Sequence, residues 1–384
     1  MNRPRVVVSG VGVLSANART VGEFKDTLVA GQSALGSLLY GAARDWPFST
    51  GAQVDPLVLR TRLGPINGSA DKAMALYPVD DALASSCLTE DQRSRCAVVV
   101  GCVLYNGRNQ IAEIVGDEYK LGPNRYVLDA ACSSGAHAIA LGWELIRNRK
   151  VSTVLAVAYN VVLLKDVAGL FKLGILTRQP VRPFDERRTG TQPGEGSGAL
   201  VLEDLEHARA RGAPIFAEIA GVGLGSDAHH IVHPNPDGRG LSAAIDGALR
   251  SADLRASEVD YINAHGTATK LNDPAETAAI HTSLGEDAFR VPVSSTKPIT
   301  GHTLGAAGMV EAIATLLAVQ HDFIPPTLNH ESPDPLCDLD YVASGTRYQP
   351  VNIALSNSAG FGGLYSCIAF KKCDVAGIAG QERP

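Results

Sequence analysis

The stretch Val127–Lys150, VLDAACSSGAHAIALGWELIRNRK, places one cysteine between a short apolar run and a long helical pattern. The run before Cys132 is typical of a buried strand, and the residues after it repeat apolar side chains at helical spacing. We therefore expect Cys132 at the N-terminus of a helix, where the macrodipole and free N–H groups favour a thiolate over a thiol. A buried cysteine after a strand is commonly a packing residue, so this stretch alone leaves both roles open.

The same alternation of strand and helix patterns recurs along the chain and predicts an α/β protein with largely parallel sheets. Short β-branched apolar runs predict buried strands at residues 5–13, 96–104, 152–162, 198–203, 215–222, 259–264, 291–295 and 352–356. Helical periods cover residues 20–30, 70–84, 133–149, 240–252, 273–283 and 306–319.

A charged segment in the middle of the chain, EDLEHARARGAP at Glu203–Pro214, predicts a boundary between two halves. We place the halves at residues 1–208, which carry Cys132, and 209–384, which carry the histidine and lysine candidates. Each half has one long helical pattern rich in small residues. This similarity suggests a duplication, although no repeat of fixed period is legible.

Composition excludes several classes of function. The 384 residues carry a net charge of -6, which argues against a nucleic-acid partner. The seven cysteines are scattered without a CxxC pair, as expected for cytosolic thiols. The longest apolar run, Val151–Leu164, is too short to cross a bilayer, and the apolar start of the chain is interrupted by Ser9 and Gly10. We expect a soluble cytoplasmic protein without a membrane span.

Two later segments place histidines and a lysine directly after expected strands. In YINAHGTATKLNDPAET, His265 stands beside glycine and hydroxyl residues, where it can act as a donor or base or be satisfied by loop backbone. VSSTKPITGHTLGAAGMVEA carries Lys297 and His302 before a glycine-rich turn. A buried Lys297 needs a carboxylate partner, and Glu311 on the following helix is the candidate. A solvated loop lysine is the alternative.

Two glycine- and histidine-rich segments have less specific patterns. LSNSAGFGGLYS is a strand that runs into a glycine loop at Phe361, and it lacks P-loop and GxGxxG spacing. A backbone N–H donor beside a mobile aromatic ring fits it better than a phosphate cradle. SDAHHIVHP holds His229, His230 and His233 without an acidic or cysteine ligand at metal spacing, so we expect no metal site. We expect His230 to line or support the entrance of the site.

One cysteine, two histidines and a lysine at strand exits suit acyl transfer through a thioester. The sequence here resembles the β-ketoacyl-acyl carrier protein synthases, elongating Cys-His-His enzymes of the thiolase-like condensing superfamily. The resemblance implies an α/β, thiolase-like, five-layered αβαβα fold of two pseudo-duplicated halves, usually in a dimer. Its motifs are DAACSSG at Cys132, RPFDERRTGTQPGEGSGALVLE at Arg182–Glu203, NAHGTATKLNDPAE at His265, SSTKPITGHTLGAAGMVE at Lys297 and His302, and NSAGFGG near the end.

The resemblance implies a role for each matching catalytic residue. Cys132 takes an acyl group from the 4′-phosphopantetheine arm of an acyl carrier protein, and the N–H groups of Cys132 and Phe361 form the oxyanion hole. His265 and His302 hold the thioester carbonyl of malonyl-acyl carrier protein while carbon dioxide leaves. The resulting carbanion attacks the Cys132 thioester and lengthens the chain by two carbons.

The remaining matches imply supporting roles. Lys297, paired with Glu311, orders the site and fixes the protonation of the histidines. Thr267 and Thr269 contact the pantetheine arm, and Phe361 is an aromatic gate. No cofactor is bound permanently, because the substrates arrive on phosphopantetheine. The implied partners are the acyl carrier protein and a second subunit, in a homodimer or in a heterodimer with a related ketosynthase-like chain.

Departures from the family pattern favour a specialised-metabolite, polyketide-like pathway or a divergent fatty acid pathway. The alternatives are an acyltransferase or hydrolase that acts on carrier-protein thioesters without condensation, and a non-catalytic chain-length partner, against which Cys132 argues. We expect His137 to pack or to meet a backbone carbonyl. The departures are Ala359, Leu364 and Tyr365 in the glycine loop, Lys270 in place of a common proline, AYNVV at Ala158–Val162, and a short Gly101–Asp129 segment.

Overall fold

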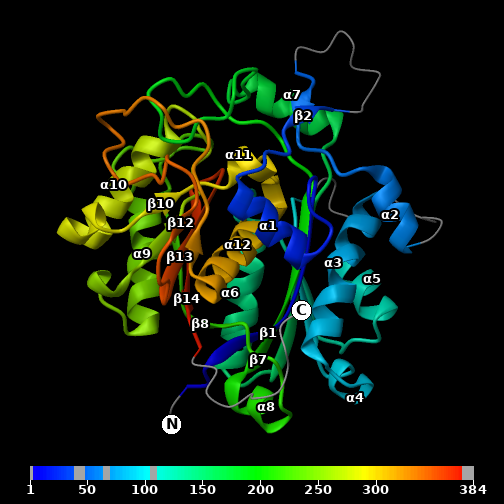
Figure 1. Ribbon diagram of the computed structural model, residues 1–384. Coiled ribbons are helices and arrows are strands. Elements are labelled where there is room, and N and C mark those ends of the chain that lie inside the picture. Colours follow the sequence, from blue (N-terminus) through cyan, green and yellow to red (C-terminus); the bar gives the residue numbers. More distant parts are fainter. Residues whose placement is uncertain (1–2, 39–47, 64–69, 104–109, 374–384) are drawn as a thin grey trace.

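The computed structural model describes residues 3–38, 48–63, 70–103 and 110–373. The chain forms α-helices on and between the faces of a large mixed sheet (Figure 1). The strands of this sheet are β1 (Val6–Ser15), β4 (Ala97–Gly101), β5 (Arg125–Leu128), β6 (Thr153–Asn160), β7 (Gly196–Asp204), β8 (Ala217–Ser226), β9 (Tyr261–Asn263), β10 (Val293–Ser294), β13 (Ile353–Gly360) and β14 (Leu364–Lys371). Two small ribbons pair β2 (Gly36–Ser37) with β3 (Thr50–Gly51) and β11 (Phe323–Ile324) with β12 (Arg347–Tyr348).

The six longest helices of the described residues follow the periods seen in the sequence, and the shorter ones were not predicted. Thr20 caps α1 by accepting the N–H of Glu23, as expected at a helix start. The helices are α1 (Val21–Ala30), α2 (Pro56–Leu63), α3 (Ala70–Ser86), α4 (Glu90–Arg93), α5 (Ile111–Glu118), α6 (Ser134–Arg147), α7 (Leu164–Lys172), α8 (Leu205–Ala210), α9 (Arg239–Ala252), α10 (Asn272–Leu284), α11 (Lys297–Thr300) and α12 (Ala307–His321).

The strand order repeats in the two halves of the sheet. The order is β10-β9-β13-β14-β8-β1-β7-β6-β4-β5, so each half, taken from its outer edge, runs through its own third, second, fourth, fifth and first strands. β1 and β8 pair antiparallel at Val6–Val8 and join the halves into one sheet. The two halves therefore each contain five strands in the same order. This repeat is the duplication that the sequence suggested.

The expectation of largely parallel sheets is wrong. The pairs of β4 with β5 and β6, and of β9 with β10 and β13, are parallel. Pairs that involve β1, β7, β8 or β14 are antiparallel. Helices cover both faces of the sheet, so the strands are buried and apolar. An apolar run in the sequence indicates that a strand is buried, but it does not show whether the strand is parallel or antiparallel to its neighbours.

The layers run helix, sheet, helix, sheet, helix across the molecule (Figure 1). α3 covers the outer face of the first half with α5 beside it, and α9 covers the outer face of the second half with α10 beside it. α6 and α12 form the middle layer and contact strands of both halves. Glycines allow these two helices to meet closely: a Cβ on Gly135 would lie 2.6 Å from the backbone N of Met309.

The middle layer is the apolar centre of the protein. Leu304–His321, which includes α12, is the single stretch of the described residues that is long and apolar enough to cross a membrane, and 89% of it is buried inside the protein. The charged segment between the halves is also partly buried. Glu203 is fully buried and accepts hydrogen bonds from Ser9, His207 and Arg211, so this segment begins as a packed network and not as a solvated linker.

Some elements had no clear pattern in the sequence. β14 was not predicted, because Ser366 divides its apolar residues into two short groups. The short α5 lies in the Gly101–Asp129 segment, which the sequence analysis described as short and polar, whereas β5 is the strand expected before Cys132. Residues 104–109 of that segment lie outside the described residues.

Candidate active site

Cys132 lies in a tight connection between β5 and α6. Ala131 has a φ of 50°, which is uncommon for a residue with a Cβ, and its N–H donates to Asp129 Oδ1 at 2.8 Å. The Ser134 hydroxyl accepts the N–H of Ala130 at 2.8 Å and donates to the carbonyl of Ala131 at 2.6 Å. These bonds hold the Cys132 side chain at the start of α6, as the sequence predicted.

The thiol of Cys132 is protonated at rest. Its side chain is only 7% exposed, and burial raises the pKa of the Cys132 thiol to about 12, although Lys297 favours the thiolate. Burial thus opposes the thiolate that the helix N-terminus was expected to favour, and its effect on the pKa is larger than that of Lys297. Any acyl transfer to Cys132 has to remove this proton.

His265 follows β9 and is fixed by a carboxylate on α10. Glu276 accepts the backbone N–H groups of His265 and Gly266, both at 2.8 Å. Gly266 has a φ of 41°, and a Cβ at this position would lie 2.6 Å from the Cβ of Ser295. Glycine is therefore required for the turn that carries the histidine.

Lys297 at the start of α11 is fully buried and forms an ion pair with Glu311 on α12. The same ammonium donates to the carbonyl of His265 and lies 3.3 Å from its Nδ1. An ammonium can only donate, so Nδ1 of His265 accepts and the ring proton is on Nε2. The Lys297–Glu311 pair that the sequence predicted thus fixes the tautomer of His265.

His302 completes a pair of histidines. Its backbone N–H donates to the carbonyl of Gln192 at 2.8 Å, and its ring lies edge-on to that of His265 with centroids 5.4 Å apart. Burial, followed by Lys297, lowers the pKa of both histidines well below 6.5. Both rings are neutral, and each can offer one N–H to a ligand oxygen.

Asp273 and Glu276 on α10 are buried carboxyl groups that the sequence analysis did not single out. Asp273 on α10 accepts the N–H of Phe184 at 2.7 Å, and burial raises the pKa of Asp273 and of Glu276 to about 6. Burial likewise raises the pKa of Glu311 to about 7, against the effect of Lys297. The available signal was two acidic residues, three positions apart, on the helix that follows His265.

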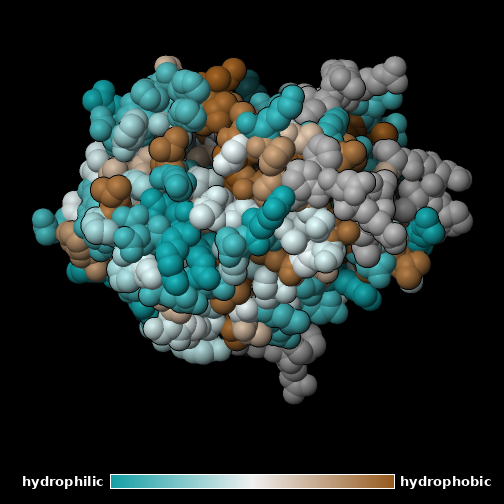
Figure 2. All heavy atoms as spheres, turned by 90° about the horizontal axis from the view of Figure 1, so that it is seen from above, coloured by the Kyte–Doolittle hydropathy of each residue, from teal (hydrophilic) through white to brown (hydrophobic). Residues whose placement is uncertain are grey.

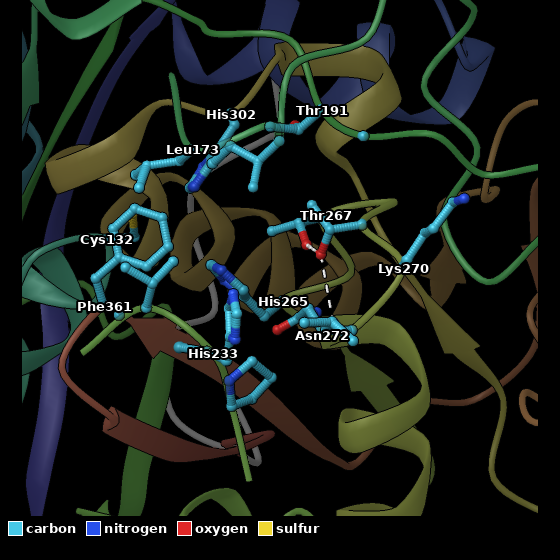
Figure 3. Close-up of a pocket in the computed structure, with 18 of the residues that line it drawn as sticks. Cys132, Leu173, Thr191, His233, His265, Thr267, Lys270, Asn272, His302 and Phe361 are labelled. Carbon is cyan, nitrogen blue, oxygen red and sulfur yellow. Dashed lines mark hydrogen bonds between the residues drawn. The ribbon is translucent and has the colours of Figure 1, made fainter. Parts of the chain in front are cut away.

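The glycine loop after β13 lies against the nucleophile. A Cβ on Gly360 would overlap the carbonyl oxygen of Ala130, so glycine allows this close approach. Phe361 belongs to the same apolar cluster as Cys132, and the two side chains lie next to each other in the cavity (Figure 3). The peptide groups of both residues thus lie at one end of the site.

A second set of contacts ties this loop to the segment after β8. The N–H of Gly362 donates to the carbonyl of Ile231 at 2.8 Å, and the Tyr365 hydroxyl donates to Asp227 Oδ2 at 2.8 Å. The Tyr365 ring occupies the space where a Cβ on Gly240 would be. Tyr365, a departure from the family pattern, therefore links strand β14 to the opposite wall.

A cavity of about 490 Å³ connects these groups. Figure 3 shows Cys132 and Phe361 at one end, the two histidines near them, and the threonines beyond. The hydroxyls of Thr267 and Thr269 lie 2.9 Å apart. Of the residues proposed for the site, Lys297 and Glu311 do not line the cavity and act from behind it. The lining includes Cys132, His265, His302, Thr267, Thr269 and Phe361.

The departures from the family pattern also gather at the cavity. Ala359, Tyr365 and Lys270 line it, whereas Leu364 does not. In the AYNVV segment, Val162 packs in the apolar cluster of Cys132.

The histidine-rich loop supports the entrance differently from the expectation. His233 lines the cavity, and His230 stacks on it with ring centroids 4.4 Å apart. His230 was expected to line or support the entrance. It does not line the cavity, and its Nδ1 accepts the N–H groups of Val232 and His233 within the loop that carries the lining His233. Among the described residues, no three His, Cys, Asp or Glu side chains are grouped to hold a metal ion. His137 meets the carbonyl of Ser133, as predicted.

Comparisons with known proteins were made by family and by individual relative. Residues 80–208 match the N-terminal domain of beta-ketoacyl synthases, and residues 216–331 match the C-terminal domain. A 3-oxoacyl-[acyl-carrier-protein] synthase 2 of Coxiella burnetii is 32% identical over 97% of this chain and 99% of the relative. One from Synechocystis sp. is 45% identical over 65% of this chain, and the alignment covers 62% of that relative. The tetracenomycin polyketide synthase ketoacyl synthase alpha subunit of Streptomyces glaucescens is 34% identical over 94% of this chain and 96% of the subunit.

Solved structures give the same result. The ishigamide ketosynthase/chain length factor superposes with a TM-score of 0.91, 31% identity, and coverage of 97% of this chain and 100% of that one. A type II polyketide ketosynthase bound to a hexaketide, in complex with its acyl-carrier protein, gives a TM-score of 0.88 at 29% identity, with coverage of 97% and 100%. The chain therefore belongs to the β-ketoacyl synthase family of condensing enzymes and has their thiolase-like fold.

Proposed function

We propose that this protein catalyses the decarboxylative condensation of a Cys132-bound acyl group with malonyl-acyl carrier protein, which gives a β-ketoacyl thioester. One observation carries the proposal: a buried cysteine and two neutral histidines line the same cavity. The reaction needs both an acyl acceptor and donors for an enolate, and this cavity offers both kinds of group at one end. No permanently bound cofactor enters the reaction.

In the first step, Cys132 Sγ attacks the thioester carbonyl of the incoming acyl carrier protein. The pantetheine thiol leaves and takes up the proton that Cys132 loses, because the thiol pKa of about 12 keeps the proton on sulfur until then. The N–H groups of Cys132 and Phe361 receive the negative charge that develops on the carbonyl oxygen. The close approach of Gly360 to Ala130 supports this assignment, since it brings the two peptide groups together.

In the second step, malonyl-acyl carrier protein loses carbon dioxide. The bond between the carboxyl carbon and the α carbon breaks, and its electron pair forms an enolate on the thioester. Nε2–H of His265 and an N–H of His302 donate to the enolate oxygen, which neutral rings can do without a change of charge. The α carbon then attacks the acyl carbonyl on Cys132, a new carbon–carbon bond forms, and Cys132 leaves and regains a proton.

Lys297 and Glu311 are positioning residues in this scheme. The Lys297 ammonium holds the tautomer of His265 and disfavours protonation of both histidines by its charge. Glu311 balances that charge in the interior, where an unpaired ammonium is costly. Thr267 and Thr269 offer hydroxyls to the amides of the pantetheine arm, farther from Cys132 along the cavity.

The substrate class is best assigned to a specialised-metabolite, polyketide-like pathway. Similarity to the tetracenomycin subunit and to the ishigamide and hexaketide-bound ketosynthases supports this assignment. The residues that differ from the family pattern, Ala359, Tyr365 and Lys270, all line the cavity and so change the surface that a substrate meets. A divergent fatty acid pathway is the alternative, supported by the 3-oxoacyl synthase relatives.

The partners we propose are an acyl carrier protein and a second ketosynthase-like subunit in a cytoplasmic complex. Two exposed apolar side chains, Phe171 at 42% and Leu173 at 44% exposure, offer a docking face for the carrier, and Leu173 also lines the cavity. Figure 2 shows apolar patches on this upper face of the molecule. We also propose the division of the chain into residues 1–208 and 209–384, which the repeated strand order supports.

Intact-mass measurement with acyl-carrier protein, followed by addition of malonyl-carrier protein, tests the function. We expect a mass increase equal to the acyl group, absent in Cys132→Ala, and then release of carbon dioxide with formation of a β-ketoacyl product. An adduct without any decarboxylation would assign the protein to acyl transfer or hydrolysis. The absence of an adduct on the wild type would make it a non-catalytic partner.

A further inference from the structure

Lys270 gives the cavity a single fixed charge. Of the described residues that line it, Lys270 is the one with a permanently charged side chain, and no carboxylate is among them. The whole chain carries a net charge of -6, so an unopposed cation at this place is not a consequence of a basic surface. A cavity with one cation and no anion is suited to a ligand that carries negative charge.

The backbone that carries Lys270 is held firmly. Arg188 donates to the carbonyl of Thr269 at 3.1 Å and to that of Lys270 at 3.4 Å. Arg188 itself is only 6% exposed and forms an ion pair with Asp334. The Lys270 side chain, in contrast, is exposed, and no ion pair joins it to the described residues. The Lys270 ammonium is thus exposed to solvent on a side chain whose backbone is held by Arg188.

The position of Lys270 along the cavity identifies the ligand. In Figure 3, Cys132 lies at one end, Thr267 in the middle, and Lys270 at the end farthest from the nucleophile with its ammonium directed outward. A 4′-phosphopantetheine arm has the same order of groups: a thioester, then two amides, then a phosphodiester. When the thioester is at Cys132 and the amides are at the threonines, the phosphate is the group that reaches the mouth.

We propose that the Lys270 ammonium binds the phosphate of the phosphopantetheine arm and so makes the enzyme prefer phosphorylated carriers of the acyl group. The proposal rests on the proposed function, because only a carrier-borne thioester brings that phosphate to the site. The proline of the family pattern at this position has no hydrogen-bond donor, so the contact depends on the lysine that stands here.

The expected size of the effect is modest, because Lys270 is exposed and solvent screens its charge. An exposed ion pair of this kind corresponds to about a two- to fivefold change in binding. The change should appear in KM and not in kcat, since Lys270 lies far from the reacting atoms and binds substrate and transition state equally.

The test compares two small substrates that differ only in the phosphate: an acyl-4′-phosphopantetheine and the matching acyl-pantetheine. The rate of Cys132 acylation is followed by intact mass for the wild type, Lys270→Met, Lys270→Arg and the control Lys150→Met, an exposed lysine after α6. We expect Lys270→Met to raise KM for the phosphorylated substrate about two- to fivefold and to leave KM for acyl-pantetheine unchanged. Lys270→Arg should keep the preference, and increasing salt should abolish it in the wild type.

Three results would overturn the proposal. Equal loss with both substrates would mean that Lys270 shapes the mouth without binding phosphate. An effect confined to intact acyl-carrier protein, with none on free acyl-phosphopantetheine, would assign Lys270 to a carboxylate of the carrier protein. Failure of every variant, including the wild type, to acylate Cys132 from either substrate or from acyl-carrier protein would reject the proposed function itself, and this inference with it.

Discussion

The two halves of the molecule have the same strand order but contribute opposite kinds of chemistry. In the first half, the connection before α6 carries Cys132 two residues ahead of the helix; in the second, Gly305 stands two residues ahead of α12. A Cβ on Gly305 would lie 2.8 Å from the backbone N of Val103, so this place has no room for a nucleophile. The histidines come instead from the second half, His265 after β9 and His302 after α11. In the proposed reaction, the two halves of the duplicated fold thus supply the acyl acceptor and the enolate donors separately.

The sheet edges differ between the halves as well. β10, the outer strand of the second half, is fully buried, and the N–H of Val293 donates to the carbonyl of Asp340 at 2.8 Å. β5, the outer strand of the first half, is partly exposed, with Tyr126 at 37%. An exposed strand edge can pair with another chain, so the first half is the side on which we place the second subunit.

The division of chemistry predicts that each half can be inactivated separately. Cys132→Gln should reduce condensation by about four orders of magnitude or more, because no thioester can form, while decarboxylation of malonyl-carrier protein continues at the histidines. The measurements are β-ketoacyl product and released carbon dioxide. Cys102→Ala, a buried thiol of the same half that does not line the cavity, is the control and should condense normally. Loss of both activities in Cys132→Gln would contradict the separation.

The reciprocal change is His302→Ala in the second half. Removal of one donor to the enolate should lower decarboxylation about 10²- to 10³-fold, whereas acylation of Cys132 by acyl-carrier protein should remain. Intact mass measures acylation of Cys132 in the first half. Carbon dioxide release measures decarboxylation at the histidines of the second half. His281→Ala, a partly exposed histidine on α10 outside the cavity, is the matched control. Equal loss of acylation and decarboxylation would show that the halves are not independent.

The two halves should also differ in how they make the free energy of unfolding depend on pH. His302 is neutral when folded because burial lowers its pKa well below 6.5, and the unfolded chain takes up the proton near pH 6.5. Its contribution to stability is therefore present above pH 6.5 and is lost as the pH falls, by up to about 1.4 kcal/mol per pH unit. His302→Asn should remove this dependence. Cys132→Ala should leave the pH dependence of stability unchanged between pH 5.5 and 7.5, because the Cys132 pKa of about 12 is outside that range.

Urea unfolding at pH 5.5 and 7.5 measures this difference. The carboxyls of Asp273 and Glu276 have the opposite sign, since burial raises their pKa to about 6 and the folded state binds the extra protons. The wild-type dependence is the sum of both signs, so the informative quantity is the difference between the wild type and His302→Asn. An equal loss of stability on acidification in the two proteins would contradict the neutral histidine.

The sequence was informative where function depends on residue type at a strand exit. Cys132, His265 and Lys297 stand at such exits, whereas His302 follows α11, and glycines beside them mark close approaches. Pattern and resemblance together predicted that these residues gather at one site. The sign of the Cys132 pKa shift was not predictable, because its burial depends on side chains distant in the sequence, such as Val162, Leu170 and Leu304. The support of His265 by Glu276 was missed because the sequence pattern does not show how the helix that follows His265 packs against it.

Local sequence patterns also do not show whether a strand runs parallel or antiparallel to its neighbour. β14 returns antiparallel beside β13 because the Gly360–Leu364 turn sends it back along the sheet, and the apolar residues of β14 do not themselves show this direction. This hairpin gives the second half a loop that the first half does not have. The loop carries Phe361, and the contact of Tyr365 with Asp227 is what anchors its returning strand.

Tyr365→Phe should have the smallest effect of these changes. It tests whether the loop that carries Phe361 in the second half can move. The change removes one hydrogen bond and keeps the ring over Gly240, so the free energy of unfolding should fall by about 1 kcal/mol. Asp227 still accepts the N–H groups of Asn235 and His229, which prevents a larger loss from an unsatisfied carboxylate. Tyr348→Phe, at an exposed position, is the control.

Chemical denaturation measures the stability of both tyrosine variants, and acylation of Cys132 with acyl thioesters of increasing length measures access past Phe361. Because Tyr365 anchors β14 and does not touch the reacting atoms, we expect acylation by the shortest thioester to change less than about twofold. A looser loop should admit longer chains more readily, so the rate with long thioesters should rise relative to Tyr348→Phe. If the rate falls equally for all lengths, the Tyr365 hydroxyl acts on the chemistry itself, and the loop of the second half is part of the site and not a gate before it.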